Sequence, residues 1–320
     1  MLQYLDMTKQ TKASGFEALK EKESREAESS GSSLKLSASS ISKLKDCPRK
    51  WEFSYVHFSQ DPPGEAAVIG TQGHEIMENF FGLDPSERTE PNLKEIAQTT
   101  WDNFYETFQE TFPDTSRSEL SLKQEVWQSS TGVFDFENPK KTKVHSIELP
   151  IEIVYRDIPF RGFIDRLEYN DDGTLCILDW KMGKVPKPEY TRAKIIQVLL
   201  YAWALEKIPE IEETPTKATL LYARDGVRID VDITPKMIRL AEKEIDTAID
   251  NLTQYFGQEF FPAKTGPLCG WCPNILECPE GRDYFDKMCG IGRMPTHAPA
   301  WGWFHQEAME VMIKDKEYEN

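Results

Sequence analysis

The 320-residue chain contains no run of apolar residues long enough to cross a lipid bilayer. Its first residues, Met1 to Tyr4, lack the basic and then apolar pattern of a secretory signal. Both absences argue against a membrane protein and against an exported one. We therefore expect a cytoplasmic protein without a membrane partner, large enough for one large domain or two small ones.

Positive charge is also scarce, because 38 Lys and Arg stand against 54 Asp and Glu and the formal net charge is −16. This balance counts against a broad surface for nucleic acid. Basic residues nevertheless cluster in three short segments, at residues 43–50, 140–143 and 181–194. Each segment is compatible with a local binding surface and with an ordinary solvated face.

The chain changes composition along its length. Residues 1–33 are rich in Lys, Glu and Ser, so we expect a disordered N-terminal segment there. We expect one ordered domain over residues 34–290 and a C-terminal tail with Pro and Trp over residues 291–320. No internal repeat is visible.

Hydrophobic periodicity and turn residues predict the helices and strands of the ordered part. We expect helices over residues 39–45, 49–58, 67–81, 93–111, 119–128, 190–207 and 236–256, with a short helix in the tail. We expect strands over residues 144–156, 160–169, 174–181, 218–223 and 227–233. A helical front section followed by strands and helices indicates an α/β protein with a mixed core.

Charged residues stand on two predicted strands that follow one another in the chain. Side chains alternate between the faces of a strand, so Asp179 and Lys181 project on the same side. Asp165 ends the motif Gly162-Phe-Ile-Asp on the preceding strand. Such groups are costly unless they are hydrated, paired or bound to metal. Two carboxylates on Mg²⁺ or Mn²⁺, with a lysine beside an attacked phosphate, meet this need, and a solvent-exposed edge with a salt bridge is the alternative.

Further polar residues stand at helical spacing. His74 and Glu78 lie four apart and share one face of a predicted helix. Gln197 and Tyr201 have the same spacing on an otherwise apolar helix, where a buried amide needs partners. Glu148 on the first strand is a candidate for a further acid in the site. Structural roles remain open, as satisfied interior groups for His74 and Gln197 and as a solvated carboxylate for Glu148.

The order of these motifs resembles the RecB-like branch of the PD-(D/E)xK nuclease superfamily. In sequence the motifs are Gly70-x-x-x-His74, Glu148, Gly162-x-x-Asp165, Asp179-x-Lys181 and Gln197-x-x-x-Tyr201. The resemblance runs from about Leu36 to Pro279. It implies a restriction-endonuclease-like fold, in which helices flank a mixed β-sheet core behind a helical N-terminal section. It also implies hydrolysis of phosphodiester bonds in DNA with Mg²⁺ or Mn²⁺.

The resemblance assigns roles to individual residues. The metal ligands would be His74, Asp165, Asp179 and the backbone carbonyl of Trp180. Lys181 would position the water and stabilise the phosphate, while Gln197 and Tyr201 would support DNA contacts and the geometry of the site. We add Glu148 to the expected catalytic residues Asp165, Asp179, Lys181 and Gln197. We expect Lys184 and Arg192, in the basic segment after the site, to contact DNA beside Tyr201.

The six cysteines do not suggest disulfides, since the chain lacks an export signal. Three of them follow the pattern C-x₂-C-x₅-C, namely Cys269, Cys272 and Cys278. Cys47 could supply a fourth thiolate, and Cys289 competes for that place. Spacing alone is compatible with zinc and with an iron–sulfur cluster. We expect Cys176, inside a strand, to be a small core residue.

A Cys-Pro pair before an aromatic helix, together with a C-terminal C-x₂-C-x₅-C-P, resembles the iron–sulfur nucleases of the same superfamily. These include AddB nuclease domains, exonuclease V and the CRISPR-associated RecB-like exonucleases. The resemblance implies a [4Fe–4S] cluster on Cys47, Cys269, Cys272 and Cys278. The cluster would be a C-terminal staple that joins the ends of the nuclease domain, away from the hydrolytic chemistry.

We therefore expect a metal-dependent DNA exonuclease that acts on single strands or DNA ends, in recombination and repair or in phage or CRISPR DNA processing. No segment matches G-x-x-x-x-G-K-[ST], so unwinding would need a helicase or recombination partner. We expect the protein in the cytoplasm of a bacterial, archaeal or phage-infected cell. In a eukaryote we would expect it in an organelle or in the nucleus. Two alternatives stay open: a non-catalytic DNA-binding or assembly subunit on the same fold, and a zinc-stapled structure-specific endonuclease.

Overall fold

The computed structural model describes residues 35–59, 63–101 and 104–307. The segment expected to be disordered and the end of the tail lie outside these residues. The described chain divides into two compact units. The first contains residues up to Ala38 together with Pro63–Lys243, and the second contains Ser39–Pro62 and the chain from Glu244 onward. The domain boundaries expected near residues 33 and 291 remain predictions.

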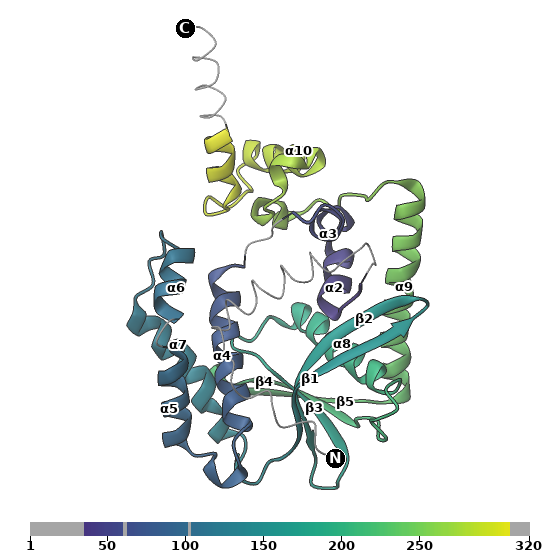
Figure 1. Ribbon diagram of the computed structural model, residues 1–320. Helices are drawn as coiled ribbons and strands as arrows, with labels where there is room; N and C mark the ends of the chain where they lie inside the picture. Colours follow the sequence, from purple (N-terminus) through teal and green to yellow (C-terminus); the bar gives the residue numbers. More distant parts are fainter. Residues whose placement is uncertain (1–34, 60–62, 102–103, 308–320) are drawn as a thin grey trace, which may run out of the picture. The chain divides into compact units, whose positions relative to one another are not determined.

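The first unit is built on a five-stranded sheet (Figure 1). Its strands are β1 (Lys143–Tyr155), β2 (Ile158–Tyr169), β3 (Leu175–Trp180), β4 (Lys217–Tyr222) and β5 (Val227–Asp232). Their order in space follows their order in the sequence, and all neighbours are antiparallel except β3 and β4. A parallel pair needs a long crossover, which helix α8 (Pro188–Leu205) supplies.

Helices precede the sheet in the chain and pack against it. They are α4 (Glu65–Phe81), α5 (Glu90–Trp101), α6 (Phe104–Thr111) and α7 (Glu119–Thr131), with short 3-10 turns at Pro85–Glu87 and Gly132–Asp135. A further 3-10 turn, Ala223–Asp225, connects β4 to β5. Figure 1 shows these four helices grouped beside the strands. Their apolar side chains form one core with Leu178 and Trp180 of β3. Lys181, which follows on the other face of β3, reaches α8 instead.

The centre of the sheet explains why two segments look apolar throughout. Every residue of β3 is buried, and α8 is buried without interruption from Val198 to Leu205. Strand β5 alternates between exposed and covered residues, as expected for a strand with one solvated face. Within the described residues, no helix is long and apolar enough to cross a membrane.

The second unit is helical. Its elements are the greater part of α2 (Ala38–Asp46), then α3 (Pro48–Tyr55), the later part of α9 (Pro235–Gln258), α10 (Pro279–Gly290) and 3-10 turns at Pro267–Trp271 and Ile275–Glu277. Trp51 is fully buried and stacks on Phe261 with ring centroids 5.8 Å apart. A separate small core contains Ile275, Phe285 and Met294.

The predicted α/β class with a mixed sheet between helices is confirmed. Most predicted elements begin and end within two or three residues of the observed ones. One difference is that the helix expected over 93–111 is present as the two helices α5 and α6, with residues 102–103 between them outside the description. The short helix expected in the tail begins at Ala300.

Candidate active site and cysteine cluster

Asp165 lies between two other carboxylates across three strands. The pairs Ile147–Arg166 and Leu149–Ile164 bracket it on β1, so Glu148 stands opposite Asp165. On the other side Arg166 pairs with Leu178, and the next positions in register are Asp165 and Asp179. Asp165 Oδ2 accepts a hydrogen bond from the backbone amide of Trp180 at 2.6 Å. The paired residues of β2 and β3 end at Arg166 and Leu178. Beyond that point the amide of Trp180 donates to the Asp165 side chain and not to a main-chain carbonyl.

His74 approaches the carboxylates from α4. Its Nδ1 lies 3.5 Å from Asp165 Oδ2. One ligand atom from each of His74, Glu148 and Asp165 lies within 4.8 Å of the other two, which is close enough for one metal ion. An imidazole with two carboxylates suits a divalent cation such as Mn²⁺ or Mg²⁺.

Glu148 reaches this group through an unusual backbone conformation. Its φ is 46°, in the left-handed region that non-glycine residues rarely adopt. The residue falls in the middle of β1, and the ladder pairs resume on both sides of it. Backbone strain of this kind persists where the surroundings demand a particular side-chain direction, and it is concentrated at functional sites. The sequence could not indicate this conformation, and a solvated carboxylate was the simpler expectation.

Burial and neighbouring charges shift the pKa values of two residues of the site, Asp165 and His74. Desolvation raises the pKa of the Asp165 carboxyl well above its usual range, and the charge of Asp179 raises it further. The pKa of His74 is lowered by desolvation, although the charges of Asp179 and Glu148 and the backbone carbonyl of Trp180 act to raise it. A neutral imidazole can bind a cation, and closely spaced carboxylates repel one another. A divalent cation would therefore stabilise the ionised carboxylates of this site strongly.

Asp179 forms an ion pair with Lys181 and is not part of the group of His74, Glu148 and Asp165. The Lys181 ammonium contacts Asp179 Oδ2, but that buried oxygen makes no hydrogen bond of acceptable geometry. Lys181 Nζ also lies 3.5 Å from Gln197 Oε1 on α8. Asp179 is therefore placed to contribute an oxygen to a cation beside Asp165, while Lys181 spans the distance to α8.

Tyr201 follows Gln197 in the series of polar contacts that begins with Asp179 and Lys181. Gln197 Nε2 donates to the Tyr201 hydroxyl at 3.2 Å. A Cβ atom at Gly162 would stand only 2.6 Å from Tyr201 Cε1, so the glycine of this motif provides the space for the ring. Tyr201 is only 8% exposed, which leaves little of the side chain for contact with DNA.

Arg166 packs against the side chain of Trp180, a contact that the sequence did not predict. The Arg166 guanidinium stacks on the rings of Trp180 and Phe81, with centroid distances of 4.8 and 4.1 Å. Arg166 is fully buried and forms ion pairs with Glu137 and Glu168. Because Trp180 turns its carbonyl toward His74, this buried arginine fixes the segment that carries a predicted ligand.

The other residues expected to bind DNA lie on the surface. Lys184 and Arg192 are both exposed. Their roles stay predictions.

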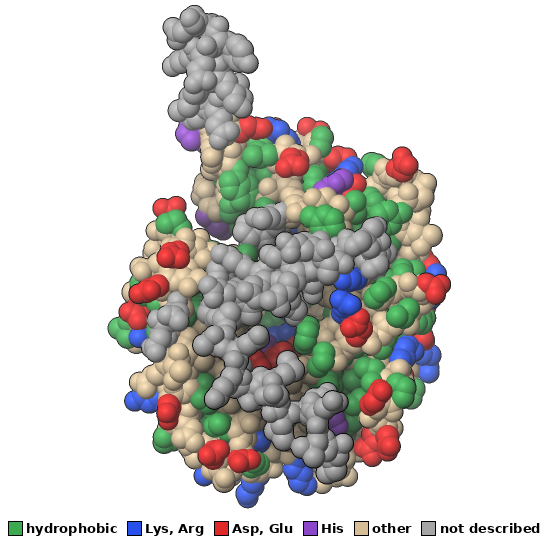
Figure 2. Space-filling model, viewed as in Figure 1, with side chains coloured by type: hydrophobic (Ala, Val, Ile, Leu, Met, Phe, Trp, Pro, Cys, Tyr) green, Lys and Arg blue, Asp and Glu red, His purple; other side chains and the backbone are tan. Residues whose placement is uncertain are grey.

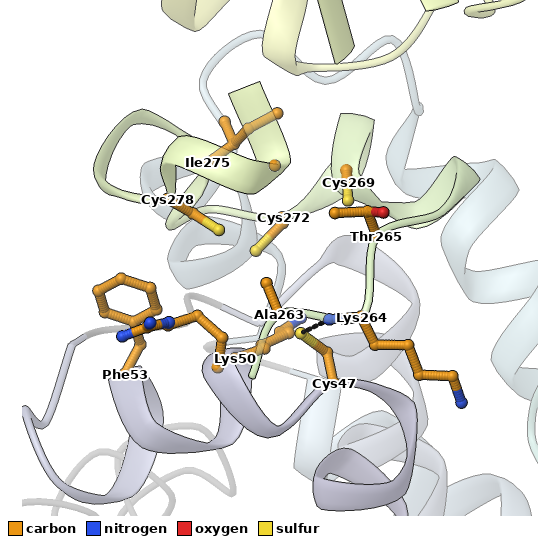
Figure 3. Close-up of a pocket in the computed structure, with 12 residues that line it drawn as sticks. Cys47, Lys50, Phe53, Ala263, Lys264, Thr265, Cys269, Cys272, Ile275 and Cys278 are labelled. Carbon is orange, nitrogen blue, oxygen red and sulfur yellow. Dashed lines mark hydrogen bonds between the residues drawn. The ribbon is translucent and has the colours of Figure 1, made fainter. Parts of the chain in front are cut away.

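The four predicted cluster ligands line one pocket in the second unit. Figure 3 shows the sulfur atoms of Cys47, Cys269, Cys272 and Cys278 directed toward a common space. Cys47 comes from the start of α3, and the other three come from the turns before α10. The remaining cysteines do not line the pocket: Cys176 is buried in β3, and Cys289 is on α10.

Each of these four sulfurs has a backbone amide directed toward it. Lys264 N donates to Cys47 Sγ, and Gly266 N donates to Cys269 Sγ, both at 3.4 Å. Burial raises the pKa of the Cys272 and Cys278 thiols, while the amides of Asn274 and Gly281 lower it. Amides aimed at sulfur stabilise the thiolate form, which is the form that binds metal.

The fold and the acidic site define the class of protein. The chain belongs to the PD-(D/E)XK nuclease superfamily, whose family model matches residues 35–279. The match includes the acids, the lysine and the four clustered cysteines.

Among curated proteins, the chain is similar to an ATP-dependent helicase/deoxyribonuclease subunit of Streptococcus uberis (strain ATCC BAA-854 / 0140J). The two are 27% identical over 156 residues, which cover 47% of this chain. The matched part is 14% of the length of that protein.

Proposed function

We propose that this chain is a divalent-metal-dependent deoxyribonuclease that degrades single-stranded DNA from an end. The observation that carries the proposal is the convergence of His74, Glu148 and Asp165 within 4.8 Å, with the Asp179–Lys181 ion pair beside them. Membership of the PD-(D/E)XK superfamily supports nuclease chemistry at this position. The digestion experiment described below tests the preference for ends and for single strands.

The roles of the residues follow from their surroundings. His74, Glu148, Asp165 and Asp179 would hold one or two ions of Mg²⁺ or Mn²⁺, with the Trp180 carbonyl as a further ligand. Such an ion polarises the phosphate and lowers the pKa of a bound water. Release of Lys181 from Asp179 would leave its ammonium free to stabilise the negative charge that develops on the phosphate oxygens.

Gln197 and Tyr201 would act on Lys181 rather than on the substrate. The amide oxygen of Gln197 faces the ammonium, and the Tyr201 hydroxyl accepts from the same amide group. These contacts restrict the rotamers of Lys181, so the ammonium has a fixed position when Asp179 turns to a cation. Orientation of this kind lowers the reorganisation needed in the transition state.

The cysteine pocket would hold a [4Fe–4S] cluster with a structural role. Within the described residues, no three cysteine sulfurs lie within 4.8 Å of one another. A tetrahedral zinc ion with Zn–S bonds of about 2.3 Å needs sulfurs roughly 3.8 Å apart, whereas a four-iron cluster separates its ligands more widely. Arg49, Lys50 and Lys264 line the same pocket, and their charge suits a group held by four thiolates.

A helicase partner would supply the single strand. The similar streptococcal protein is named as a subunit of a helicase/deoxyribonuclease, and the present chain matches only part of it. DNA unwound by such a partner would reach the metal site as a free strand. This assignment predicts that the chain alone degrades single strands faster than duplexes.

Digestion of end-labelled linear and covalently circular single-stranded DNA tests the proposal. With Mg²⁺ or Mn²⁺ the wild type should shorten the linear strand and leave the circle intact. Lys181→Ala should lose about 10²–10³-fold in rate, as expected when a group that stabilises transition-state charge is removed. Lys94→Ala, an exposed lysine on α5, is the matched control and should retain the rate. Absence of hydrolysis in the wild type would refute nuclease activity, and equal cleavage of circles would refute the need for an end.

A further inference from the structure

Four side chains form a single stripe along α8. Tyr190, Lys194, Gln197 and Tyr201 follow one another at spacings of four, three and four residues. At 3.6 residues per turn they lie within about 60° of each other around the helix axis. Of these four residues, only Gln197 and Tyr201 were expected site residues from the sequence.

The stripe runs from the interior of the site to solvent. Tyr201 is buried, and Gln197 contacts Lys181 at the candidate active site. Lys194 is exposed, one turn toward the beginning of the helix. Tyr190 follows one turn further and is 65% exposed. A rise of 1.5 Å per residue separates Lys194 from Gln197 by about 4.5 Å along the axis, and Tyr190 from Lys194 by about 6 Å.

Lys194 carries a charge that the fold does not neutralise. Within the described part of the chain no carboxylate forms an ion pair with it. Local burial lowers the pKa of Lys194, the charge of Lys181 lowers it further, and that of Asp179 raises it. Lys194 is therefore within the electrostatic range of the site while the residue as a whole is exposed.

The distribution of charge over the molecule gives this lysine particular weight. The chain has a net charge of −16, and Figure 2 shows acidic and basic side chains mixed over the face in view rather than a broad basic field. The net negative charge opposes a general attraction of a DNA strand to the protein. Cations close to the site therefore gain importance for binding.

We propose that the exposed end of this stripe is the track of the DNA strand next to the bond that is cleaved. Lys194 contacts the phosphate adjacent to the scissile one, and the Tyr190 ring stacks on a neighbouring base. The inference rests on the proposed function, since it takes the metal site as the place of cleavage. A base that is paired in a duplex does not offer its face, so stacking on Tyr190 favours single strands.

The stripe also separates Lys194 from Arg192, which belongs to the same basic segment of the sequence. The two residues are two positions apart, so their side chains point about 160° away from each other around α8. Arg192 is exposed but lies off the stripe. The proposal therefore assigns the phosphate contact to Lys194 and not to Arg192.

The test combines binding and turnover on one short fluorescent single-stranded oligonucleotide. Affinity is measured by anisotropy in EDTA over a range of NaCl concentrations, and kcat and KM are measured with Mg²⁺. Lys194→Ala should weaken binding about fivefold and raise KM with little change in kcat, because the residue touches a phosphate that does not react. The slope of log K against log[NaCl] should become shallower by about 0.7, the value for one contact on a single strand. Lys194→Arg should restore both, and Lys94→Ala should change neither.

Tyr190 is tested by a separate pair of variants. Tyr190→Ala should weaken binding of the single strand about tenfold or more, whereas Tyr190→Phe should retain it, because stacking needs the ring and not the hydroxyl. The salt slope should stay unchanged in both. The preference for a single strand over a duplex of the same sequence should shrink in Tyr190→Ala.

The outcomes distinguish the two proposals. A wild type that binds the oligonucleotide but never hydrolyses it would refute the proposed function. A wild type that hydrolyses it while Lys194→Ala keeps the parental KM and salt slope would refute the track on α8. A larger loss in Arg192→Ala than in Lys194→Ala would also overturn the track, because the strand would then follow a different face of the helix.

Discussion

Glu148 stands opposite Asp165 in the β1–β2 ladder, and the two carboxylates share a candidate cation site with His74. Two acids directly across from each other repel unless a cation lies between them. Glu148 accepts a left-handed backbone conformation to hold this position. The local structure of β1 thus serves the site at a cost to its own stability.

Replacement of Glu148 should separate stability from activity. Glu148→Gly should be more stable than Glu148→Ala by about 1 kcal/mol, because glycine adopts a positive φ without the steric cost of a Cβ atom. Both variants should lose most of the metal-dependent activity, since neither carries the carboxylate. Urea unfolding in EDTA measures the first effect, and digestion of linear DNA with Mn²⁺ measures the second. Equal stability of the two variants would show that the positive φ of Glu148 does not destabilise the fold.

The raised pKa of Asp165 predicts how stability depends on pH. Burial and the Asp179 charge raise this pKa in the folded protein well above the unfolded value of about 3.9. The contribution of Asp165 to stability is therefore fully present below the unfolded pKa and is lost as the pH rises through the folded pKa. In EDTA, the wild type should become less stable relative to Asp165→Asn as the pH rises from about 4 toward neutrality. Thermal denaturation of both proteins across this range provides the comparison.

Added metal provides the control for this pH effect. Mn²⁺ should raise the melting temperature of the wild type, and more strongly as the pH rises, because protons compete with the cation for Asp165. It should have little effect on Asp165→Asn. A difference between the two metal-free proteins that stays constant with pH would show that Asp165 titrates normally.

Gly162→Ala should disturb the site through Tyr201. The added Cβ would lie 2.6 Å from Tyr201 Cε1, so the ring must move. We expect a loss of about 1–3 kcal/mol in stability and a large fall in kcat, because Tyr201 supports Gln197 and Gln197 faces Lys181. In a Tyr201→Ala background the same substitution should cost much less stability, and this double-mutant cycle identifies the clash. Additive effects would place the cause elsewhere.

Loss of one clustered cysteine should remove the predicted iron–sulfur cluster. Anaerobically purified wild type should be brown and contain iron and acid-labile sulfide, whereas Cys47→Ser should lose both and unfold at a lower temperature. Cys289→Ser is the matched control in the same unit and should keep the chromophore, because Cys289 does not line the pocket. Equimolar zinc without sulfide in the wild type would contradict the cluster and favour the zinc-stapled alternative.

Much of the candidate site could be predicted because its motifs are local. The alternation of a strand places Asp179 and Lys181 on one face, and helical spacing places Gln197 beside Tyr201. The structure brings these residues together with His74 and Asp165, while their catalytic and ligand roles stay predictions. The position of Glu148 could not be derived in this way, because it depends on the register of two strands and on a single backbone angle. The support from Arg166 was also hidden, since its partners come from separate segments of the chain.

The sequence by itself determined the alternation and periodicity that define the strands and helices, and it contained the acids and the lysine of the predicted site and the spaced cysteines. These features depend on neighbours along the chain, whose relative directions are set by covalent geometry. Only the tertiary structure decided that Glu148 joins His74 and Asp165, that Gly162 makes room for Tyr201, and that Lys194 and Tyr190 continue the line of Gln197 into solvent. Burial, strand register and the exposure of each side chain arise from packing between distant segments, and a local pattern does not specify them.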